Sequence, residues 1–295
     1  MMNYYNEIKT EILNNEITKK VKDYSKNKSD LTTYYNVGKL LSEAGKHYGE
    51  GIIKEYSDKL TKEFGKGYSQ RNLRNMRQFY CVSTKWQTLS AILSWSIYCE
   101  LIWFDNINKI NYYITICKEQ NLSVRELRKR IKNKEYERLD ESTKLKLIKQ
   151  ETLKVEDAIK NPIIINNRFN YEVISEKVLQ KIILEDIEEF MKELGNSFSF
   201  IGSEYPIKIG CNYNYIDLLL YNIEFNCYVV VELKVTELKK EHIGQIEVYM
   251  NYINKNLRKQ AQDKTIGIIL CRKDNKFIME YCSDERIKVR EYFLA

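Results

Sequence analysis

The sequence predicts a two-domain α+β protein, in which an all-helical domain precedes a domain built on a mixed central β-sheet flanked by helices. The chain has 295 residues, which is enough for about two domains. Apolar residues recur at helical spacing in the first half, whereas helical segments alternate with short apolar runs in the second. The charge divides in the same way: residues 1–150 carry 28 Lys and Arg against 18 Asp and Glu, a net of +10, and residues 151–295 carry 20 against 23, a net of −3.

The composition excludes several classes of protein. A hydrophobic content of 43% and a charged content of 30% suit ordinary soluble cores, and 11 Gly with 2 Pro exclude collagen-like or low-complexity sequence. The seven cysteines contain no C-x-x-C pair and there are only two histidines, which argues against a zinc site. We therefore expect reduced thiols in a cytoplasmic protein. The chain shows neither the apolar core of a secretory signal nor a membrane-spanning run, so we expect no membrane partner.

The first domain, predicted over residues 1–139, contains a helix-turn-helix-like pattern. A helix over 52–64 is followed by a Gly-containing turn and by a second helix that begins at Ser69, with Tyr68 and Leu73 placed to pack on each other. Ser123 begins another basic helix, for which a solvated face is the favoured alternative. The polar and cationic side chains of these helices suit contacts with phosphates and base edges. The alternative is that they form the solvated faces of amphipathic helices in an α-helical bundle. The candidate nucleic-acid-binding residues are Arg71, Arg74, Asn75, Gln78, Arg125, Arg128 and Lys129.

The second domain is predicted over residues 171–295, after a charged linker at 140–170. It begins with an amphipathic helix over 175–194 and a strand over 198–209, whose proline indicates a sheet edge. A β-hairpin follows, with strands at Ile216–Tyr221 and Cys227–Glu232. The remaining predicted elements are a helix that carries Gln245 and Tyr249 one turn apart and strands at 265–271 and 277–281.

The hairpin carries the residues with the clearest chemical use. Its second strand is apolar and ends in Glu232-Leu233-Lys234, while Asp217 lies on the first strand. Charges on a buried strand are costly unless they are paired or bind a metal. Asp217 and Glu232, helped by the Leu233 carbonyl, would form an oxygen site of the kind that Mg²⁺ prefers. Lys234 points to the same side of the strand as Glu232, where it can orient or deprotonate an attacking water or offset charge.

These residues resemble the motifs of the PD-(D/E)XK nuclease superfamily. Asp217 matches its first carboxylate and Glu232-Leu233-Lys234 its (D/E)-x-K, although Ile216 stands where the motif has proline. Gln245-x-x-x-Tyr249 is similar to the Q-x-x-x-Y signature of the RecB-like branch. The segments YYNVGKLL, YSQRNLRNMRQFY, VELK and GQIEVYMNY extend the resemblance to the YhcG-like family.

This resemblance implies a restriction-endonuclease-like second domain and an active site to which Gln245 and Tyr249 also contribute. Many members carry a further acid on the preceding helix, which suggests that Glu185 is a catalytic residue and a metal ligand.

The expected function is an Mg²⁺-dependent nuclease, with Mn²⁺ as a substitute, that hydrolyses phosphodiester bonds in DNA in restriction, repair or defence. DNA is the expected partner. A second copy of the chain is a further possible partner, with which it would form a homodimer. Two alternatives stay open. One is a non-catalytic DNA-binding or assembly protein on a nuclease-like fold, and the other is an RNA-directed nuclease.

Overall fold

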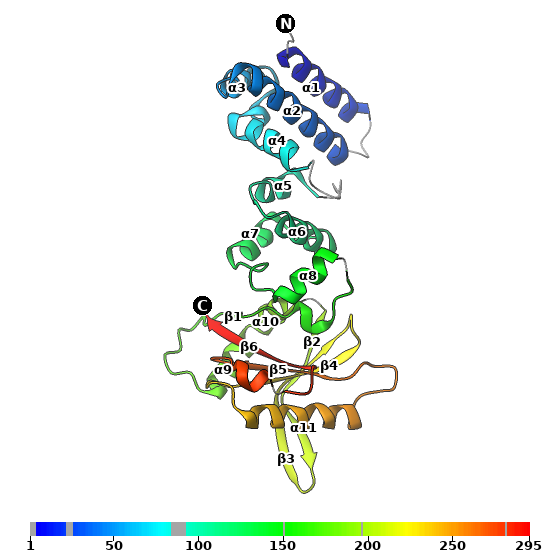
Figure 1. Ribbon diagram of the computed structural model, residues 1–295, viewed down its shortest axis with the longest axis vertical. Helices are drawn as coiled ribbons and strands as arrows, with labels where there is room; N and C mark the ends of the chain where they lie inside the picture. Colours follow the sequence, from blue (N-terminus) through cyan, green and yellow to red (C-terminus); the bar gives the residue numbers. More distant parts are fainter. Residues whose placement is uncertain (1–3, 22–25, 84–92, 150, 196, 281) are drawn as a thin grey trace. The chain divides into compact units, whose positions relative to one another are not determined.

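The computed structural model describes the chain apart from residues 1–3, 22–25, 84–92, 150, 196 and 281. Its contacts divide the chain into two compact units, Met1–Tyr136 and Glu137–Ala295. The first unit is built from helices and the second around a β-sheet (Figure 1). The predicted order, an all-α region followed by a mixed sheet flanked by helices, is confirmed.

The helices of the first unit pack around an apolar core. Ile8, Leu41 and Leu60 are fully buried in it, and Tyr68 and Leu73 lie in the same core at the start of α4. The described helices are α1 (Tyr4–Val21), α2 (Lys26–Tyr48), α3 (Ile52–Phe64), η1 (Lys66–Tyr68), α4 (Gln70–Ser83), α5 (Trp95–Leu101), α6 (Ile107–Gln120) and α7 (Val124–Lys132).

Two local features explain why α4 and α7 lie where they do. A Cβ atom at Gly38 of α2 would lie 2.1 Å from the carbonyl oxygen of Met76, so glycine permits α2 and α4 to approach closely. The Ser123 hydroxyl accepts a hydrogen bond from the backbone N–H of Glu126, whose side chain bonds back to Ser123. This reciprocal capping fixes the beginning of α7, as the sequence predicts.

The second unit is organised around a six-stranded mixed sheet with the order β1-β6-β5-β4-β3-β2. The strands β1, β6, β5 and β4 are parallel to one another, whereas β3 pairs antiparallel with both β4 and β2. The strands are β1 (Ile163–Ile165), β2 (Phe198–Ile209), β3 (Asn212–Asn222), β4 (Cys227–Leu233), β5 (Ile266–Cys271) and β6 (Ile287–Leu294). The predicted hairpin is therefore present as β3 and β4, and β2 is an edge strand as expected.

Helices cover both faces of this sheet (Figure 1). One face packs on α9 (Glu176–Glu185) and α10 (Ile187–Leu194), and the other on α11 (Lys240–Asn256). The helix predicted over 175–194 is thus two helices, interrupted at Asp186, whose φ of −140° is not helical. Within the described ranges, no helix combines the length and apolar character that crossing a membrane requires.

The structure corrects two predictions about the second half of the chain. The segment predicted as a linker at 140–170 holds α8 (Glu141–Lys149), η2 (Val155–Ala158) and strand β1, all in the second unit. Its short apolar run Ile163–Ile165 pairs with β6, so it belongs to the sheet. The strand predicted at 277–281 is also wrong where described: Lys276–Glu280 forms helix α12, which begins where the Asn275 side chain accepts from the Ile278 N–H.

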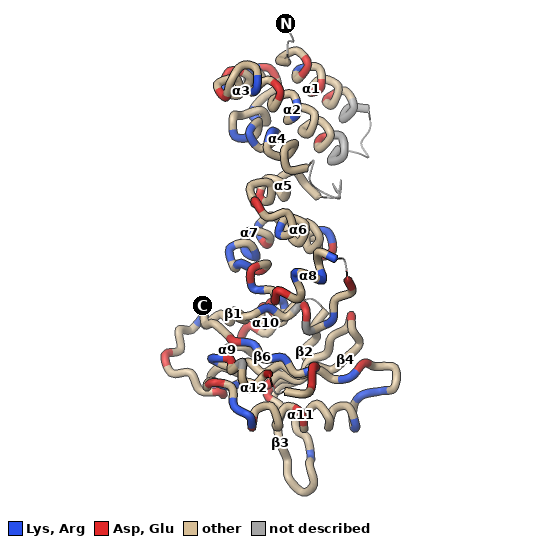
Figure 2. The backbone as a smooth tube through the Cα atoms, in the orientation of Figure 1, with Lys and Arg blue, Asp and Glu red and all other residues tan. Residues whose placement is uncertain are grey.

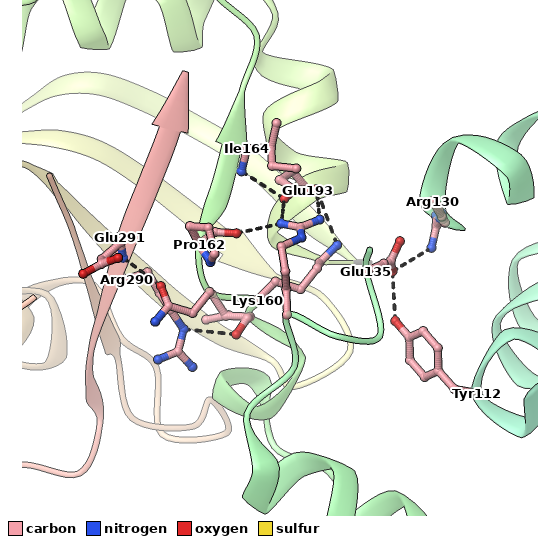
Figure 3. Close-up of polar contacts among 12 residues, drawn as sticks. Tyr112, Arg130, Glu135, Lys160, Pro162, Ile164, Glu193, Arg290 and Glu291 are labelled. Carbon is pink, nitrogen blue, oxygen red and sulfur yellow. Dashed lines mark hydrogen bonds and ion pairs between the residues drawn. The ribbon is translucent and has the colours of Figure 1, made fainter. Parts of the chain in front are cut away.

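A buried cluster of charges ties the start of this unit to α10, and Figure 3 shows it. The Glu193 carboxylate pairs with the guanidinium of Arg138, lies 3.7 Å from the Lys160 ammonium and accepts a hydrogen bond of 3.0 Å from the backbone N–H of Ile164. Arg138 also donates to the carbonyl of Pro162 at 2.7 Å. The Arg138 and Glu193 side chains are only 9% and 12% exposed, so this is a paired internal charge cluster.

Candidate active site

The antiparallel pairing of β3 with β4 brings the predicted carboxylates together. Leu218 is opposite Val231, which places Asp217 and Glu232 at the same end of the two strands. The backbone N–H of Leu233 donates a hydrogen bond of 2.8 Å to Oδ2 of Asp217. This bond holds the Asp217 carboxylate against the end of β4, where Glu232 and Lys234 lie.

Glu232 is a buried acid with an unpartnered oxygen. Its side chain is 2% exposed, and its Oε1 atom has no hydrogen-bond partner among the described residues. Burial, and then the neighbouring Asp217, raise the pKa of Glu232 to about 8. An unsatisfied buried carboxylate is rare in a folded protein because the loss of hydration is not offset. This side chain is therefore arranged for a ligand that the protein alone does not supply.

Asp217 is also a partly buried carboxylate with a raised pKa. Burial raises its pKa, while the hydrogen bond from Leu233 and the charge of Lys234 act in the opposite direction. Glu176, on helix α9, adds to the rise because it is a second negative charge in the neighbourhood. The end of the hairpin therefore gathers more negative charge than the surrounding protein neutralises.

Lys234 is the cation of this group. Its ammonium lies 3.3 Å from Oε2 of Glu232 and 3.7 Å from Oε2 of Glu176. Burial opposes its charge, but the carboxylates of Glu232, Glu176 and Asp217 outweigh burial and raise its pKa. Its backbone N–H is bound to the carbonyl of Leu270 on β5 at 2.7 Å. Lys234 is thus held as a charged ammonium, which suits it to orient or neutralise an anion more than to accept a proton.

Gln245 and Tyr249 lie on α11, which covers the sheet face that includes Val230. The Gln245 side-chain amide donates a hydrogen bond of 3.1 Å to the Tyr249 hydroxyl, and Tyr249 is buried at 6% exposure. The sequence therefore places these two side chains correctly on one helix face. The contact between them orients the amide of Gln245.

The structure separates Glu185 from this group. Glu185 ends α9, where its carboxylate accepts a hydrogen bond of 3.0 Å from the Tyr171 hydroxyl and lies 3.9 Å from the Lys181 ammonium. The acid of α9 that reaches Lys234 is Glu176, one helix length away at the start of the same helix. The resemblance suggests Glu185, whereas the acid of this helix that lies beside Lys234 in the structure is at its opposite end.

The sequence marks Glu176 as the first residue of a helix, but it does not mark Glu176 as a neighbour of the hairpin. It directly follows Ser175, whose side chain caps the helix by accepting from the Val178 N–H. One turn later, Gln180 donates a hydrogen bond of 2.9 Å to the carbonyl of Asp217, which ties the start of α9 to the hairpin. The capping signal marks the helix start, but only the tertiary contact shows which helix end meets β3.

The oxygen donors of this site fit a divalent cation, although only a few side chains contribute them. The described residues contain no group of three or more His, Cys, Asp or Glu side chains arranged to hold a metal ion. Asp217 and Glu232 nevertheless offer carboxylate oxygens, one of them buried and unpartnered, at the point where Leu233 connects them. Carboxylate and carbonyl oxygens with several waters form the shell that Mg²⁺ prefers.

In the first unit, the structure corrects two of the predicted nucleic-acid contacts. Asn75 is buried at 7% exposure, donates to Sγ of Cys99 and accepts from the indole N–H of Trp103. Gln78 donates to the carbonyl of Ile102 at 3.0 Å. Both amides are bonded inside the unit, because their helix face turns toward α5 and not toward solvent.

The predicted cations of the first unit are exposed. Arg71 and Arg74 lie on the outer side of α4, and Arg125, Arg128 and Lys129 lie on α7. The Arg128 guanidinium is 2.7 Å from the Glu100 carboxylate in a pair in which Arg128 is 62% exposed. Figure 2 shows Lys and Arg on both α4 and α7.

Comparison with known families accounts for both units. Residues 2–138 match the model of the DUF1016 N-terminal domain, and residues 156–294 match the model of the YhcG PDDEXK nuclease domain. The chain belongs to the YhcG-like family of PDDEXK nuclease-domain proteins. The second unit of this YhcG-like chain is accordingly a nuclease domain of the PDDEXK type, with the restriction-endonuclease-like fold.

Individual relatives agree with this family. A protein of Escherichia coli (strain K12) named "Putative nuclease YhcG" is 27% identical, over 81% of this chain and 76% of its own length. Two solved structures are similar in part. A crystal structure of a repair endonuclease from Pyrococcus abyssi is 20% identical with a TM-score of 0.30, covering 41% of this chain and 48% of that one. A structure of an EndoMS-dsDNA2 complex is 20% identical with a TM-score of 0.29, covering 43% and 48%. The chain thus spans about half the length of these structures.

Proposed function

We propose that this YhcG-like protein is an Mg²⁺-dependent deoxyribonuclease, with Mn²⁺ as a substitute, whose active site is formed by Asp217, Glu232 and Lys234. One observation carries the proposal: a buried carboxylate with an unpartnered oxygen stands beside a second carboxylate and a buried ammonium in a PDDEXK domain. The excess negative charge of this group requires a cation, and its lysine can contact an anion. A divalent cation would balance the carboxylates, and a phosphodiester bound to that cation would provide the anion for the lysine.

Each residue has a distinct task in this proposal. Asp217 and Glu232 hold the cation, and the Leu233 N–H fixes the orientation of Asp217. A divalent cation bound there would supply an activated water and would neutralise charge on the phosphate. The Lys234 ammonium orients the attacking water or offsets the charge that develops on the phosphate oxygens. Gln245, oriented by Tyr249, positions the lysine or the substrate, and Glu176 keeps Lys234 charged.

The first unit supplies the proposed nucleic-acid affinity. Residues 1–136 carry 24 Lys and Arg against 15 Asp and Glu, a net of +9, whereas residues 137–295 carry 24 against 26, a net of −2. Exposed arginines such as Arg71 and Arg125 can contact phosphates without reading sequence. We assign the protein to the cytoplasm, because its seven cysteines are reduced and fit a reducing compartment.

The test is a cleavage assay of the full chain on linear, circular and branched DNA and on RNA, with Mg²⁺, with Mn²⁺ and with a chelator. The active-site variants are Asp217→Asn and Lys234→Ala. We expect metal-dependent cleavage of DNA by the wild type and a loss on the order of 10³-fold or more in either variant, because each removes a charge that acts in the transition state.

The matched control is Glu185→Gln, which changes an acid outside the carboxylate group and should keep full activity. Undiminished cleavage by both active-site variants would refute the site. Metal-dependent cleavage of RNA but not of DNA would show that the enzyme is a ribonuclease. Salt-sensitive DNA binding without cleavage would instead indicate a binding protein on a nuclease fold.

A further inference from the structure

The β2–β3 hairpin extends beyond the body of the second unit, directly from the active site. Figure 1 shows its tip projecting past α11. The pairing is continuous toward the tip, with Pro206 opposite Tyr215 and Lys208 opposite Tyr213. The turn is made at Gly210, whose φ of +62° is a conformation that glycine adopts readily. Two residues before this turn, the Lys208 N–H donates to the Tyr252 hydroxyl of α11 at 3.4 Å, which anchors the hairpin.

One face of this hairpin is aromatic and exposed, and it lies on the strand that carries Asp217. Tyr213 and Tyr215 are 63% and 56% exposed, whereas Ile216 is fully buried. Tyr213 and Tyr215 are two residues apart on β3 and project to one side of the strand, and Asp217 follows two residues later in the chain. The spacing from Tyr215 to Asp217 is roughly 7 Å of strand. The two rings are therefore close enough to Asp217 for one extended ligand to contact the rings and the proposed active site.

The chemistry of this face suits unpaired nucleotides. From Tyr205 to Ile216 the sequence has one charged residue, Lys208, whose ammonium lies 5.8 Å from the Tyr213 ring centroid. Figure 2 shows the hairpin almost without charge. Binding to the backbone of duplex DNA uses many Lys and Arg side chains, and the base faces of a duplex are covered by stacking. Exposed rings with an isolated cation instead match the stacking platforms that bind single strands.

We propose that Tyr213 and Tyr215 form a stacking platform for unpaired bases next to the scissile phosphate, so that the enzyme prefers DNA with a single-stranded segment at the cleavage site. This inference deepens the proposed function and rests on it for the position of the scissile phosphate. Lys208 contacts the backbone of the same segment. The platform selects the structure of the substrate and not its sequence, because every base has a stacking face.

The test compares binding of two DNAs of equal duplex length, one with a single-stranded overhang and one blunt, to the full chain in the presence of chelator. The variants are the pairs Tyr213→Ala with Tyr215→Ala and Tyr213→Phe with Tyr215→Phe. Phe277→Ala is the control, since Phe277 is 77% exposed in the same unit but outside the hairpin. Fluorescence of 2-aminopurine in the overhang reports stacking directly.

We expect the alanine pair to lose about ten- to hundredfold in affinity for the overhang DNA, because each stacked base contributes appreciably to binding. Blunt DNA should lose less than about threefold. The phenylalanine pair and Phe277→Ala should bind like the wild type, and only the alanine pair should relieve quenching of 2-aminopurine.

Equal losses on both DNAs, or no loss on either, would overturn the platform. So would a change from dimer to monomer in size-exclusion chromatography of the alanine pair, because the tyrosines would then be a subunit interface. The proposed nuclease activity is judged separately by cleavage. A wild type that cuts DNA while the alanine pair binds overhangs normally refutes only the platform, whereas tyrosine-dependent overhang binding without any cleavage refutes only the nuclease.

Discussion

Two buried glutamates of the second unit, Glu193 and Glu232, show how burial of the same group can serve structure or function. Glu193 is surrounded by partners: the Arg138 guanidinium, the Lys160 ammonium and the Ile164 N–H. Glu232 has Lys234 on one oxygen, an unpartnered second oxygen and the like charge of Asp217 nearby. The first charge is neutralised within the fold. The second is left for a ligand, and this difference distinguishes the proposed active site from the structural charge cluster.

Removing the cation from the paired glutamate is expected to have the largest effect on stability. Arg138→Ala leaves Glu193 buried with too little positive charge, which should cost about 3–5 kcal/mol of unfolding free energy. Activity per folded molecule should be retained, because this group is not part of the active site. Chemical denaturation combined with cleavage assays at low temperature measures both.

The matched variant for this comparison is Arg168→Ala. Arg168 pairs with Asp186 at 2.5 Å but is 60% exposed, so its loss should cost less than about 1 kcal/mol. Equal costs for the two arginines would contradict the structural role given to Glu193.

The unpaired glutamate should make stability depend on pH in the absence of metal. The pKa of Glu232 is about 8 in the folded protein and near 4.5 when unfolded, so the folded state binds the proton more tightly. Stability is therefore greatest below pH 4.5 for this group and falls as pH rises to about 8, by on the order of a few kcal/mol. Asp217, whose pKa is also raised, acts in the same direction.

Thermal unfolding from pH 5 to 9 in chelator checks this, with Glu232→Gln as the comparison. The variant should show a flatter profile and a higher stability at pH 9, because glutamine carries no charge to bury. Parallel profiles for the two proteins would mean that Glu232 is already neutralised.

Substitution of the two acids of α9 should have an intermediate effect on cleavage and should show which of them belongs to the active site. Glu176→Gln removes a charge 3.7 Å from Lys234 and should lower cleavage about ten- to hundredfold, since the lysine loses part of its electrostatic support. Glu185→Gln should leave cleavage unchanged, because its contacts are with Tyr171 and Lys181. Rates measured at saturating metal decide the order, and the reverse order would restore Glu185 to the site.

The smallest effect is expected at the hydroxyl that orients Gln245. Tyr249→Phe removes one hydrogen bond acceptor while it keeps the buried ring, so cleavage should fall about five- to tenfold at nearly unchanged stability. Tyr171→Phe, which loses a hydroxyl bonded to Glu185, is the control and should keep full activity. Identical kinetics for Tyr249→Phe and the wild type would leave Tyr249 as a packing residue.

Much of this arrangement can be predicted from the sequence, because it follows from local patterns. The alternation of apolar runs and turns predicts β3 and β4, and the spacing within Glu232-Leu233-Lys234 predicts which side chains share a side. The start of α7 at Ser123 follows from its capping box. These features depend on residues close together in the chain.

The errors concern contacts between distant residues. The choice between Glu185 and Glu176 depends on which end of α9 meets the hairpin, and the role of Asn75 depends on Cys99 and Trp103. Strand β1 has three residues and is recognisable only through its pairing with β6. Local propensity carries little information about such pairings.

The most direct test of the difference between Glu193 and Glu232 is the binding of Mn²⁺, followed by the electron paramagnetic resonance of the free ion, with and without DNA. We expect an Mn²⁺ site in the wild type and in Glu185→Gln that is lost or weakened by at least about tenfold in Asp217→Asn and Glu232→Gln. Equal Mn²⁺ binding by all four proteins would contradict the claim that the unsatisfied carboxylates of the hairpin form the metal centre.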